Sequence, residues 1–263
     1  MFFKQEIIDK LIEISTQAGK IIKENYLKTA NVTYKEDSTP LTKTDILSHD
    51  YLVSELTKLI PGIPIISEES SYIAFKERKK WKEYWLIDPL DGTRGFIDKT
   101  DDFCTCIAYI KNNTPVFGMI FIPMRQACYY ANDSKVAYKL QNNELKQISV
   151  SKPKVPLRVV VGRYSIARPS IIQHLKYTQN GRYKINGIGS AIKFCLIAEG
   201  KFDYYPGIGI CSEWDTAAGG FILQAAGGSI VDQENNPMRY NTKNDLLSSM
   251  FFAAGAEPLS RTE

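Results

Sequence analysis

Apolar residues recur at helical spacing in two stretches near the N-terminus, residues 4–27 and 44–59. Each stripe predicts an amphipathic helix with one buried face, and Pro61-Gly62 ends the second. The buried positions of the first predicted helix are Ile7, Leu11, Ile14, Ala18 and Ile21, and those of the second are Ile46, Leu52, Leu56 and Leu59.

The next segments predict one strand and one connection. The sequence IPIIS, residues 63–67, predicts a short buried strand that ends at Glu68-Glu69. The charged sequence FKERKKWKEY, residues 75–84, predicts a solvated connection, either a loop or a short helix.

Between residues 105 and 146 the pattern becomes that of strands. The segments TCIAYI, PVFGMIFI, ACYYAN and KVAYKL are separated by KNNT, PMRQ and NDS, which are typical of turns. They predict an antiparallel meander. The sequence SKPKVP, residues 151–156, predicts a hinge between an N-terminal half, 1–150, and a C-terminal half, 151–263.

The C-terminal half alternates strands with helices. The strand patterns are RVVVG, YKING, FDYYP and GSIVD, and the helical patterns lie near 168–176, 189–199 and 214–226. This alternation is typical of an α/β unit.

Composition narrows the class of protein. The 263 residues are 44% hydrophobic and 24% charged, which is ordinary for a soluble globular protein. The net charge of +4 suits a small anionic substrate and is too weak to indicate a nucleic-acid polymer. The N-terminus lacks the apolar core of a signal peptide, and no run of about 18 apolar residues predicts a transmembrane span. We therefore expect a cytoplasmic protein.

The five cysteines lie in apolar surroundings, which predicts reduced and mostly buried thiols. Cys104 and Cys106 alternate within a strand pattern, so they share a face. Because no second pair accompanies them, packing is favoured over a zinc site. The two histidines, His49 and His174, are expected at the surface or as caps. The sequence GIGSAI, residues 187–192, lacks the third glycine of a dinucleotide fingerprint, although the start of its helix could hold a phosphate.

Acidic residues carry the remaining chemistry. Glu68 and Glu69 follow one strand, Asp88 and Asp91 follow another, and Asp215 opens a helix. Carboxylates are hard ligands suited to Mg²⁺, and several brought together would repel one another unless cations lay among them. The alternative is ordinary: Asp-Gly turns, an Asp cap and a solvated Glu pair.

The sequences of these segments resemble those of the inositol monophosphatase superfamily, a group of lithium-sensitive, magnesium-dependent phosphomonoesterases. Four motifs appear in the order of that superfamily: PLTKTD with Asp45, SEES, DPLDGT and WDTAAG. The resemblance covers almost the whole chain. It implies an α/β layered αβαβα sandwich with the metal site at the junction of the halves. By analogy it also implies a homodimer, and it leaves room for peripheral association with the inner membrane.

The resemblance also implies roles for single residues. Glu68 would bind one metal, Asp88 would bridge two, and the Leu90 carbonyl would complete the first site. The second metal would be held by Asp91 and Asp215, with two or three Mg²⁺ ions in all. The implied catalytic residues are Asp45, Thr93 and Glu68, where Thr93 and Asp45 orient and deprotonate the attacking water. The implied substrate-binding residues are Leu90, Asp91, Gly92, Thr93, Ser190, Lys193 and Asp215.

Within this superfamily the sequence is most similar to the 3'(2'),5'-bisphosphate nucleotidase branch. Three segments carry this similarity: YWLIDPLDGT, GIGSAIKFCLIAEG and YYPGIGICSEWDTAAG. Ile208 stands where inositol monophosphatases place a Glu that contacts the inositol ring. Ser190 and Lys193 could bind a second phosphate, although Lys193 could equally be an exposed helix residue. The chain departs from the nucleotidases at Arg94-Gly95, at Tyr164-Ser165 and at Gly207.

These features predict hydrolysis of a small phosphate monoester, adenosine 3',5'-bisphosphate, a by-product of sulfate activation. One alternative is an inositol-1-phosphatase or a broader sugar phosphatase. Another is a metal-dependent binding protein without turnover, although such a protein would not need the pair of Thr93 and Asp45.

Overall fold

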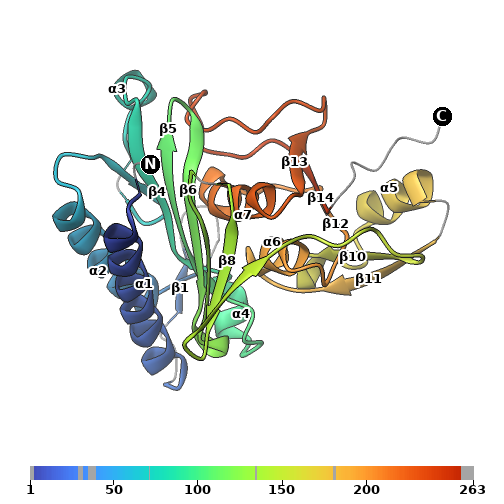
Figure 1. The fold of residues 1–263 in the computed structure, drawn as a ribbon, viewed down its shortest axis with the longest axis horizontal. Coiled ribbons are helices and arrows are strands. Elements are labelled where there is room, and N and C mark those ends of the chain that lie inside the picture. The colour runs from blue at the N-terminus through green and yellow to red at the C-terminus, as the bar shows by residue number, and fades with distance from the viewer. Residues whose placement is uncertain are drawn as a thin grey trace.

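The computed structural model describes residues 3–28, 32–34, 40–70, 72–133, 135–179 and 182–255. Its layers run from two N-terminal helices through a large sheet, two inner helices and a smaller sheet to one outer helix (Figure 1). The αβαβα sandwich that the sequence predicts is therefore confirmed. None of the described helices combines the length and the apolar character that crossing a bilayer requires.

The first layer is the pair α1 (Gln5–Tyr26) and α2 (Lys43–Leu59). Both predicted helices are confirmed, but their buried stripes are shifted. In α1, Ile8 and Ile22 are buried while Ile7 and Ile21 are only partly so, and in α2 the predicted Ile46 is exposed. The stripe of α2 instead includes Asp45 and Ser48, because this face of the helix contacts Pro89 and Thr93 at the end of β4.

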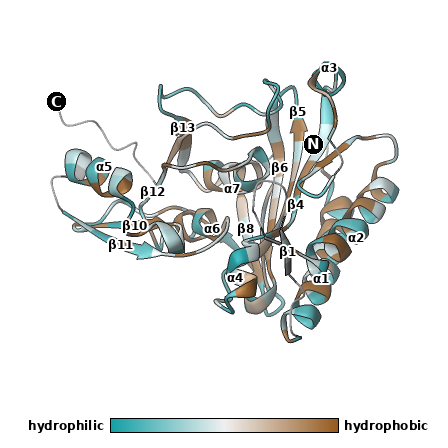
Figure 2. Cartoon of the chain, turned by 180° about the vertical axis from the view of Figure 1, so that it is seen from behind, coloured by the Kyte–Doolittle hydropathy of each residue, from teal (hydrophilic) through white to brown (hydrophobic). Residues whose placement is uncertain are grey.

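The large sheet has seven strands in the order β3-β4-β5-β6-β7-β8-β9. Only β3 and β4 are parallel, so the antiparallel meander is confirmed. Its central strands are largely hydrophobic (Figure 2). The strands are β3 (Ile65–Ser67), β4 (Glu83–Asp91), β5 (Cys104–Lys111), β6 (Thr114–Ile122), β7 (Ala127–Ala131), β8 (Ala137–Gln141) and β9 (Glu144–Ile148). A separate antiparallel pair joins β1 (Val32–Tyr34) and β2 (Pro40–Thr42).

The smaller sheet has the order β11-β10-β12-β14-β13, and β14 runs antiparallel to both of its neighbours. The inner helices α6 and α7 fill the space between the two sheets, and α5 covers the outer face (Figure 1). The strands are β10 (Leu157–Val161), β11 (Tyr183–Gly187), β12 (Tyr204–Gly207), β13 (Ser229–Asp232) and β14 (Phe251–Ala254). The helices are α5 (Pro169–Gln179), α6 (Ile192–Ala198) and α7 (Glu213–Ala225).

One of the apolar clusters joins the two halves, because it contains residues of β6, α6, α7 and β14. Residues 151–156 form no helix or strand; their role as a hinge stays a prediction.

The charged segment after β3 is less solvated than its sequence predicts. It contains the short helix α3 (Phe75–Arg78), and Arg78 is only 1% exposed. The Arg78 guanidinium donates hydrogen bonds to the side chain of Asn241 and to the carbonyls of Lys243 (3.1 Å) and Asn244. Hydrogen bonds from a charged donor stabilise more than neutral ones, so Arg78 fixes this segment to the C-terminal loop.

Both histidines are half-buried, so the prediction that they lie at the surface or cap helices is wrong. His49 Nδ1 lies 2.8 Å from Ser67 Oγ. His174 Nε2 lies 2.7 Å from the Tyr204 hydroxyl, and its ring stacks on Phe252. Each ring fills a gap between a helix and a strand.

Candidate active site

The strand β4 ends in a distorted loop. Its pairing with β5 is regular as far as Asp88 and then shifts before Asp91. Asp88 Oδ1 accepts a hydrogen bond from the Leu90 amide at 3.0 Å, and the Pro89 carbonyl accepts one from Ser48 Oγ at 2.8 Å. The Leu90 side chain packs into an apolar cluster. Its carbonyl oxygen is turned away from that cluster and lies 3.2 Å from Thr93 Oγ1.

The third aspartate comes from the other half of the chain. Asp215 lies in the first turn of α7 and forms a reciprocal capping box with Ser212, whose amide donates to Asp215 Oδ2 at 2.7 Å. Asp88, Asp91 and Asp215 each place one oxygen within 4.8 Å of the other two. Residues separated by more than 120 positions therefore meet at one point.

Burial raises the pKa of Asp88, Asp91 and Asp215, and their mutual repulsion raises it further for Asp88 and Asp215. Glu68, at the end of β3, lies close enough for its negative charge to raise the pKa of all three. Acidic groups arranged in this way are favourable as anions only when cations lie among them.

A second pair of polar side chains faces the same loop. Asp45 is buried in the first turn of α2, where Oδ2 accepts hydrogen bonds from the amide (2.8 Å) and the hydroxyl (2.6 Å) of Thr42. Its other oxygen, Oδ1, accepts a hydrogen bond from Thr93 Oγ1 at 3.0 Å. Burial raises the pKa of Asp45, although the hydrogen bonds from Thr42 oppose that rise. One oxygen thus secures the helix and the other holds Thr93.

Gly92 allows the loop to come close to its neighbours. Its φ of 94° is in the left-handed region, and it precedes α4 (Thr93–Ile97). A Cβ at this position would lie 2.7 Å from the Asp102 carbonyl oxygen and 3.1 Å from Ser190 Cβ. A larger residue would therefore separate the loop from the segment that carries Ser190.

Lys193 is buried, only 6% exposed, so its alternative as an exposed helix residue is wrong. Its ammonium donates to the Ser190 carbonyl and lies 4.9 Å from the centre of the Tyr205 ring. Burial lowers its pKa, and the charge of Asp91 opposes that shift. Ser190 and Lys193 line a cavity of about 130 Å³ together with Asp91 and Asp215.

The helix α6 begins at Ile192, three residues later than the sequence predicts. The Ala191 amide before it donates a hydrogen bond to Asp91 Oδ2. This backbone donor is therefore engaged by a carboxylate, which argues against the phosphate that the sequence allowed at this helix start.

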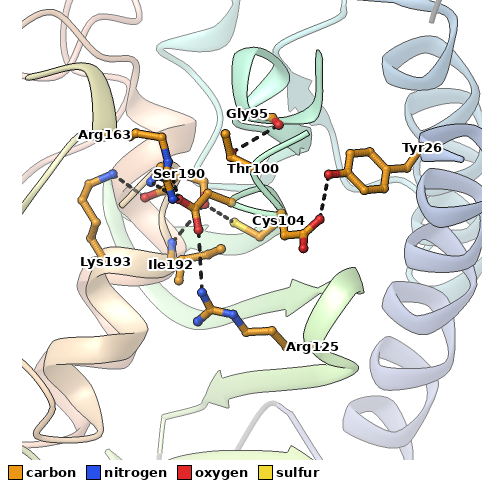
Figure 3. A network of polar contacts seen from close by, with 12 residues as sticks. Tyr26, Gly95, Thr100, Cys104, Arg125, Arg163, Ser190, Ile192 and Lys193 are labelled. Carbon is orange, nitrogen blue, oxygen red and sulfur yellow. Dashed lines mark hydrogen bonds and ion pairs between the residues drawn. The ribbon is translucent and has the colours of Figure 1, made fainter. Parts of the chain in front are cut away.

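Asp102 is a site-forming residue that the sequence did not reveal. It is buried, and its carboxylate accepts hydrogen bonds from Arg163 (Nε at 2.8 Å) and from the Gly189 amide (3.1 Å). Arg125 Nη2 lies 3.7 Å from its other oxygen. Figure 3 shows Arg125 and Arg163 converging from opposite sides beside Ser190. Since an Asp-Asp pair after a Thr resembles a solvated turn, no sequence signal marks this role.

A second cavity, of about 120 Å³, shares Tyr205, Cys211 and Phe251 with the first. Ile208 and Arg168 also line it, and Arg168 Nη1 donates to the Ile208 carbonyl at 3.0 Å. Arg168 is exposed, and no carboxylate among the described residues forms an ion pair with it. The second cavity therefore offers a cationic side chain and an apolar wall.

Arg94 and Tyr164, two residues at which the chain departs from the nucleotidase sequences, lie side by side. The Arg94 guanidinium lies 3.9 Å above the Tyr164 ring, and the Tyr164 hydroxyl donates to Asp98. Arg94 also lies 3.6 Å from Asp98. These side chains join α4 to the turn that follows β10.

Residues 4–259 match the model of the inositol monophosphatase family. The chain is 35% identical over 253 residues to the 3'(2'),5'-bisphosphate nucleotidase CysQ of Haemophilus influenzae, which covers 95% of this chain and 93% of that protein. The CysQ of Escherichia coli K12 is 35% identical over 247 residues, or 93% of this chain and 98% of that protein.

Solved structures of the same family share the fold. The crystal structure of CysQ from Bacteroides thetaiotaomicron has a TM-score of 0.84 and 30% identity, and the match covers 98% of this chain and all of that one. An IMPase from Thermotoga maritima has a TM-score of 0.77 at 23% identity, covering 96% and 93% of the two chains. The second similarity concerns the fold alone.

Proposed function

The chain belongs to the inositol monophosphatase family, and we propose that it is a Mg²⁺-dependent phosphomonoesterase that converts adenosine 3',5'-bisphosphate to AMP and phosphate. The family that the sequence predicts is thereby confirmed. One observation carries the proposal: three aspartates from different layers of the fold place oxygens within 4.8 Å of one another. The names of the CysQ relatives support the choice of substrate.

The residues present fit a site for hard cations. They are oxygen donors, and burial together with their mutual repulsion raises the pKa values of Asp88 and Asp215, a cost that cations among them would relieve. Glu68 and the Leu90 carbonyl would complete the set that holds two or three Mg²⁺ ions. When bound, the ions would screen the phosphate charge, acidify a water molecule and stabilise the departing alkoxide.

The chain's own groups would position and deprotonate the attacking water. Thr93 Oγ1 donates its hydrogen to Asp45, so its lone pairs are directed elsewhere and can accept a hydrogen bond from water. As the water attacks phosphorus in line with the leaving oxygen, its proton moves to Thr93 and the hydroxyl proton moves to Asp45. Phosphoryl transfer needs mainly positioning and charge neutralisation, so no covalent nucleophile is required.

The two cavities would divide the substrate between them, which assigns the second phosphate to Arg168 in place of the Ser190 and Lys193 that the sequence suggested. Lys193 lines the first cavity with Asp91 and Asp215, so its cation would face the phosphoryl group that is cleaved, with Ser190 beside it. The second cavity would take the nucleoside, where the free charge of Arg168 suits the second phosphate. Ile208 offers no acceptor for an inositol hydroxyl, which disfavours inositol phosphates.

Phosphate release from adenosine 3',5'-bisphosphate and from inositol 1-phosphate, each with and without Mg²⁺, tests this function. We expect Mg²⁺-dependent release from the nucleotide, and inhibition by Li⁺ as in the family. Preference for the inositol ester would establish the inositol or sugar phosphatase instead. No release from either ester would indicate a binding protein. We further propose a cytoplasmic location, as the sequence predicts, and, by analogy with the family, a role in sulfur metabolism and a homodimer.

A further inference from the structure

Two thiols lie directly behind the aspartate site. Cys104 and Cys106 occupy the same face of β5, and Cys104 is opposite Asp91 in the strand pairing. Their sulfur atoms are 3.9 Å apart, and Asp91 Oδ2 lies 3.6 Å from Cys104 Sγ and 3.9 Å from Cys106 Sγ. The three groups form a cluster whose ligand atoms lie within 4.8 Å of one another. The sequence offers no second cysteine pair, and Asp91 of the DPLDGT segment supplies a third ligand atom instead.

These separations match a tetrahedral site for a thiophilic cation. Bonds of ~2.3 Å to sulfur and ~2.1 Å to oxygen place two sulfur ligands ~3.8 Å apart, and a sulfur and an oxygen ligand ~3.6 Å apart. The observed distances of 3.6 to 3.9 Å differ from these by a few tenths of an ångström. The two thiols donate weak hydrogen bonds to the Asp91 carboxylate, so both sulfur atoms already face the oxygen that a cation would share.

We propose that Asp91, Cys104 and Cys106 form a binding site for a soft divalent cation such as Zn²⁺ or Cd²⁺, distinct from the all-oxygen Mg²⁺ site. Thiolate ligands select such cations, whereas Mg²⁺ prefers oxygen. On binding, two metal–sulfur bonds form and the two thiol protons pass to the buffer. Solvent or Ser190 Oγ, 3.5 Å from Cys104 Sγ, would complete the site.

The cation has a path to this site. The thiols are buried, but Asp91 is half-buried and lines the first cavity with Ser190. The positive charge of Lys193 opposes entry, while the site carries three negative charges when both thiols and Asp91 are ionised. Because the site and the proposed Mg²⁺ site share Asp91, a soft cation would compete with Mg²⁺. This inhibitory effect rests on the proposed function, whereas the binding does not.

The test uses the full-length, reduced and metal-free protein titrated with Cd²⁺. Cadmium bound to thiolate absorbs in the ultraviolet by charge transfer from sulfur, and cadmium bound only to oxygen does not. We expect this band to saturate at one cation per chain and to disappear in the double variant Cys104→Ser and Cys106→Ser. The single variants should each weaken Cd²⁺ binding at least tenfold, which keeps the test valid if the double variant fails to fold.

Two other thiols provide matched controls. Cys211 lines the first cavity and Cys128 is buried elsewhere in the large sheet, so Cys211→Ser and Cys128→Ser should keep the band. Absence of the band in the native protein, or its survival in the double variant, overturns the proposal. In parallel, Zn²⁺ should inhibit hydrolysis of adenosine 3',5'-bisphosphate, and excess Mg²⁺ should relieve that inhibition. Cadmium binding without any hydrolysis would refute the proposed function and leave the site standing.

Discussion

The hydrogen bond between Thr93 and Asp45 provides the sharpest test of the proposed mechanism. We consider Thr93→Val, which removes the hydroxyl at nearly constant shape, Asp45→Asn, which removes the negative charge, and the double variant. Proton transfer by a positioned group typically contributes ~10²–10⁴-fold to the rate. Each single variant should therefore lose that factor in kcat, which corresponds to about 3 to 5 kcal/mol.

The fold should survive both changes. Asparagine at position 45 can still accept the Thr42 hydrogen bonds through its oxygen, at a cost no larger than the loss of a helix cap, ~0.5–2 kcal/mol. Its amide nitrogen would then face Thr93, which would have to donate elsewhere. Valine at position 93 loses one half-buried hydrogen bond, ~1 kcal/mol. Both costs are small beside a typical stability of ~5–15 kcal/mol.

The assay is kcat for adenosine 3',5'-bisphosphate at saturating Mg²⁺, with urea unfolding as the control for stability. If the hydroxyl and the carboxylate transfer one proton as a unit, the double variant should be about as slow as the slower single variant. Multiplied losses in the double variant would show that the two groups act separately. A loss below tenfold in Thr93→Val would refute its role in orienting the water.

Three further outcomes are expected. Asp215→Asn should abolish turnover, and Mg²⁺ should stabilise this variant less against thermal unfolding than it stabilises the native protein. Without Mg²⁺ the variant should be at least as stable as the native protein, because one buried charge is gone. Burial lowers the pKa of His49, so the unfolded chain binds more protons at this residue than the folded chain does. The free energy of unfolding, measured by urea titration, should therefore fall as the pH decreases from about 7.5 to 5.5. The fall should be smaller in His49→Gln. Arg168→Gln should raise KM for adenosine 3',5'-bisphosphate at least ~10-fold, since a charged hydrogen bond contributes ~1.5–3 kcal/mol. The KM for adenosine 3'-monophosphate, which lacks the second phosphate, should hardly change. Equal effects on both substrates would exclude contact between Arg168 and the second phosphate.

The sequence predicted the elements whose patterns are strong and missed those whose patterns are weak. The β9 segment ELKQI is mostly exposed at the edge of its sheet, so it has no apolar alternation to detect. The β14 segment FFAA is short and is separated from β13 by 18 residues without a helix or strand. It is a strand because β12 and β13 flank it, a tertiary cause that a local pattern does not record.

For the candidate site, sequence motifs identified the acidic residues, whereas the residues that hold the surrounding segments in place were evident only in the structure. The order of DPLDGT and WDTAAG indicated Asp88, Asp91 and Asp215. Asp102, by contrast, depends on Arg163, which lies 61 residues away in the turn that follows β10. The sequence also did not predict that Lys193 is buried. All residues of α6 are buried, so the helix has no exposed polar face on which this lysine could lie.

The repulsion among the aspartates must be resisted by contacts that do not require a cation. The Asp91 carboxylate is held by the Ala191 amide, and Asp45 and Asp215 are each fixed by a helix cap. Asp102 joins the segments around them through its ion pair with Arg163. These contacts keep the acidic groups close even when their charges are unfavourable. Cation binding would relieve that repulsion, and the same preorganisation that weakens the fold without cations would strengthen its affinity for Mg²⁺.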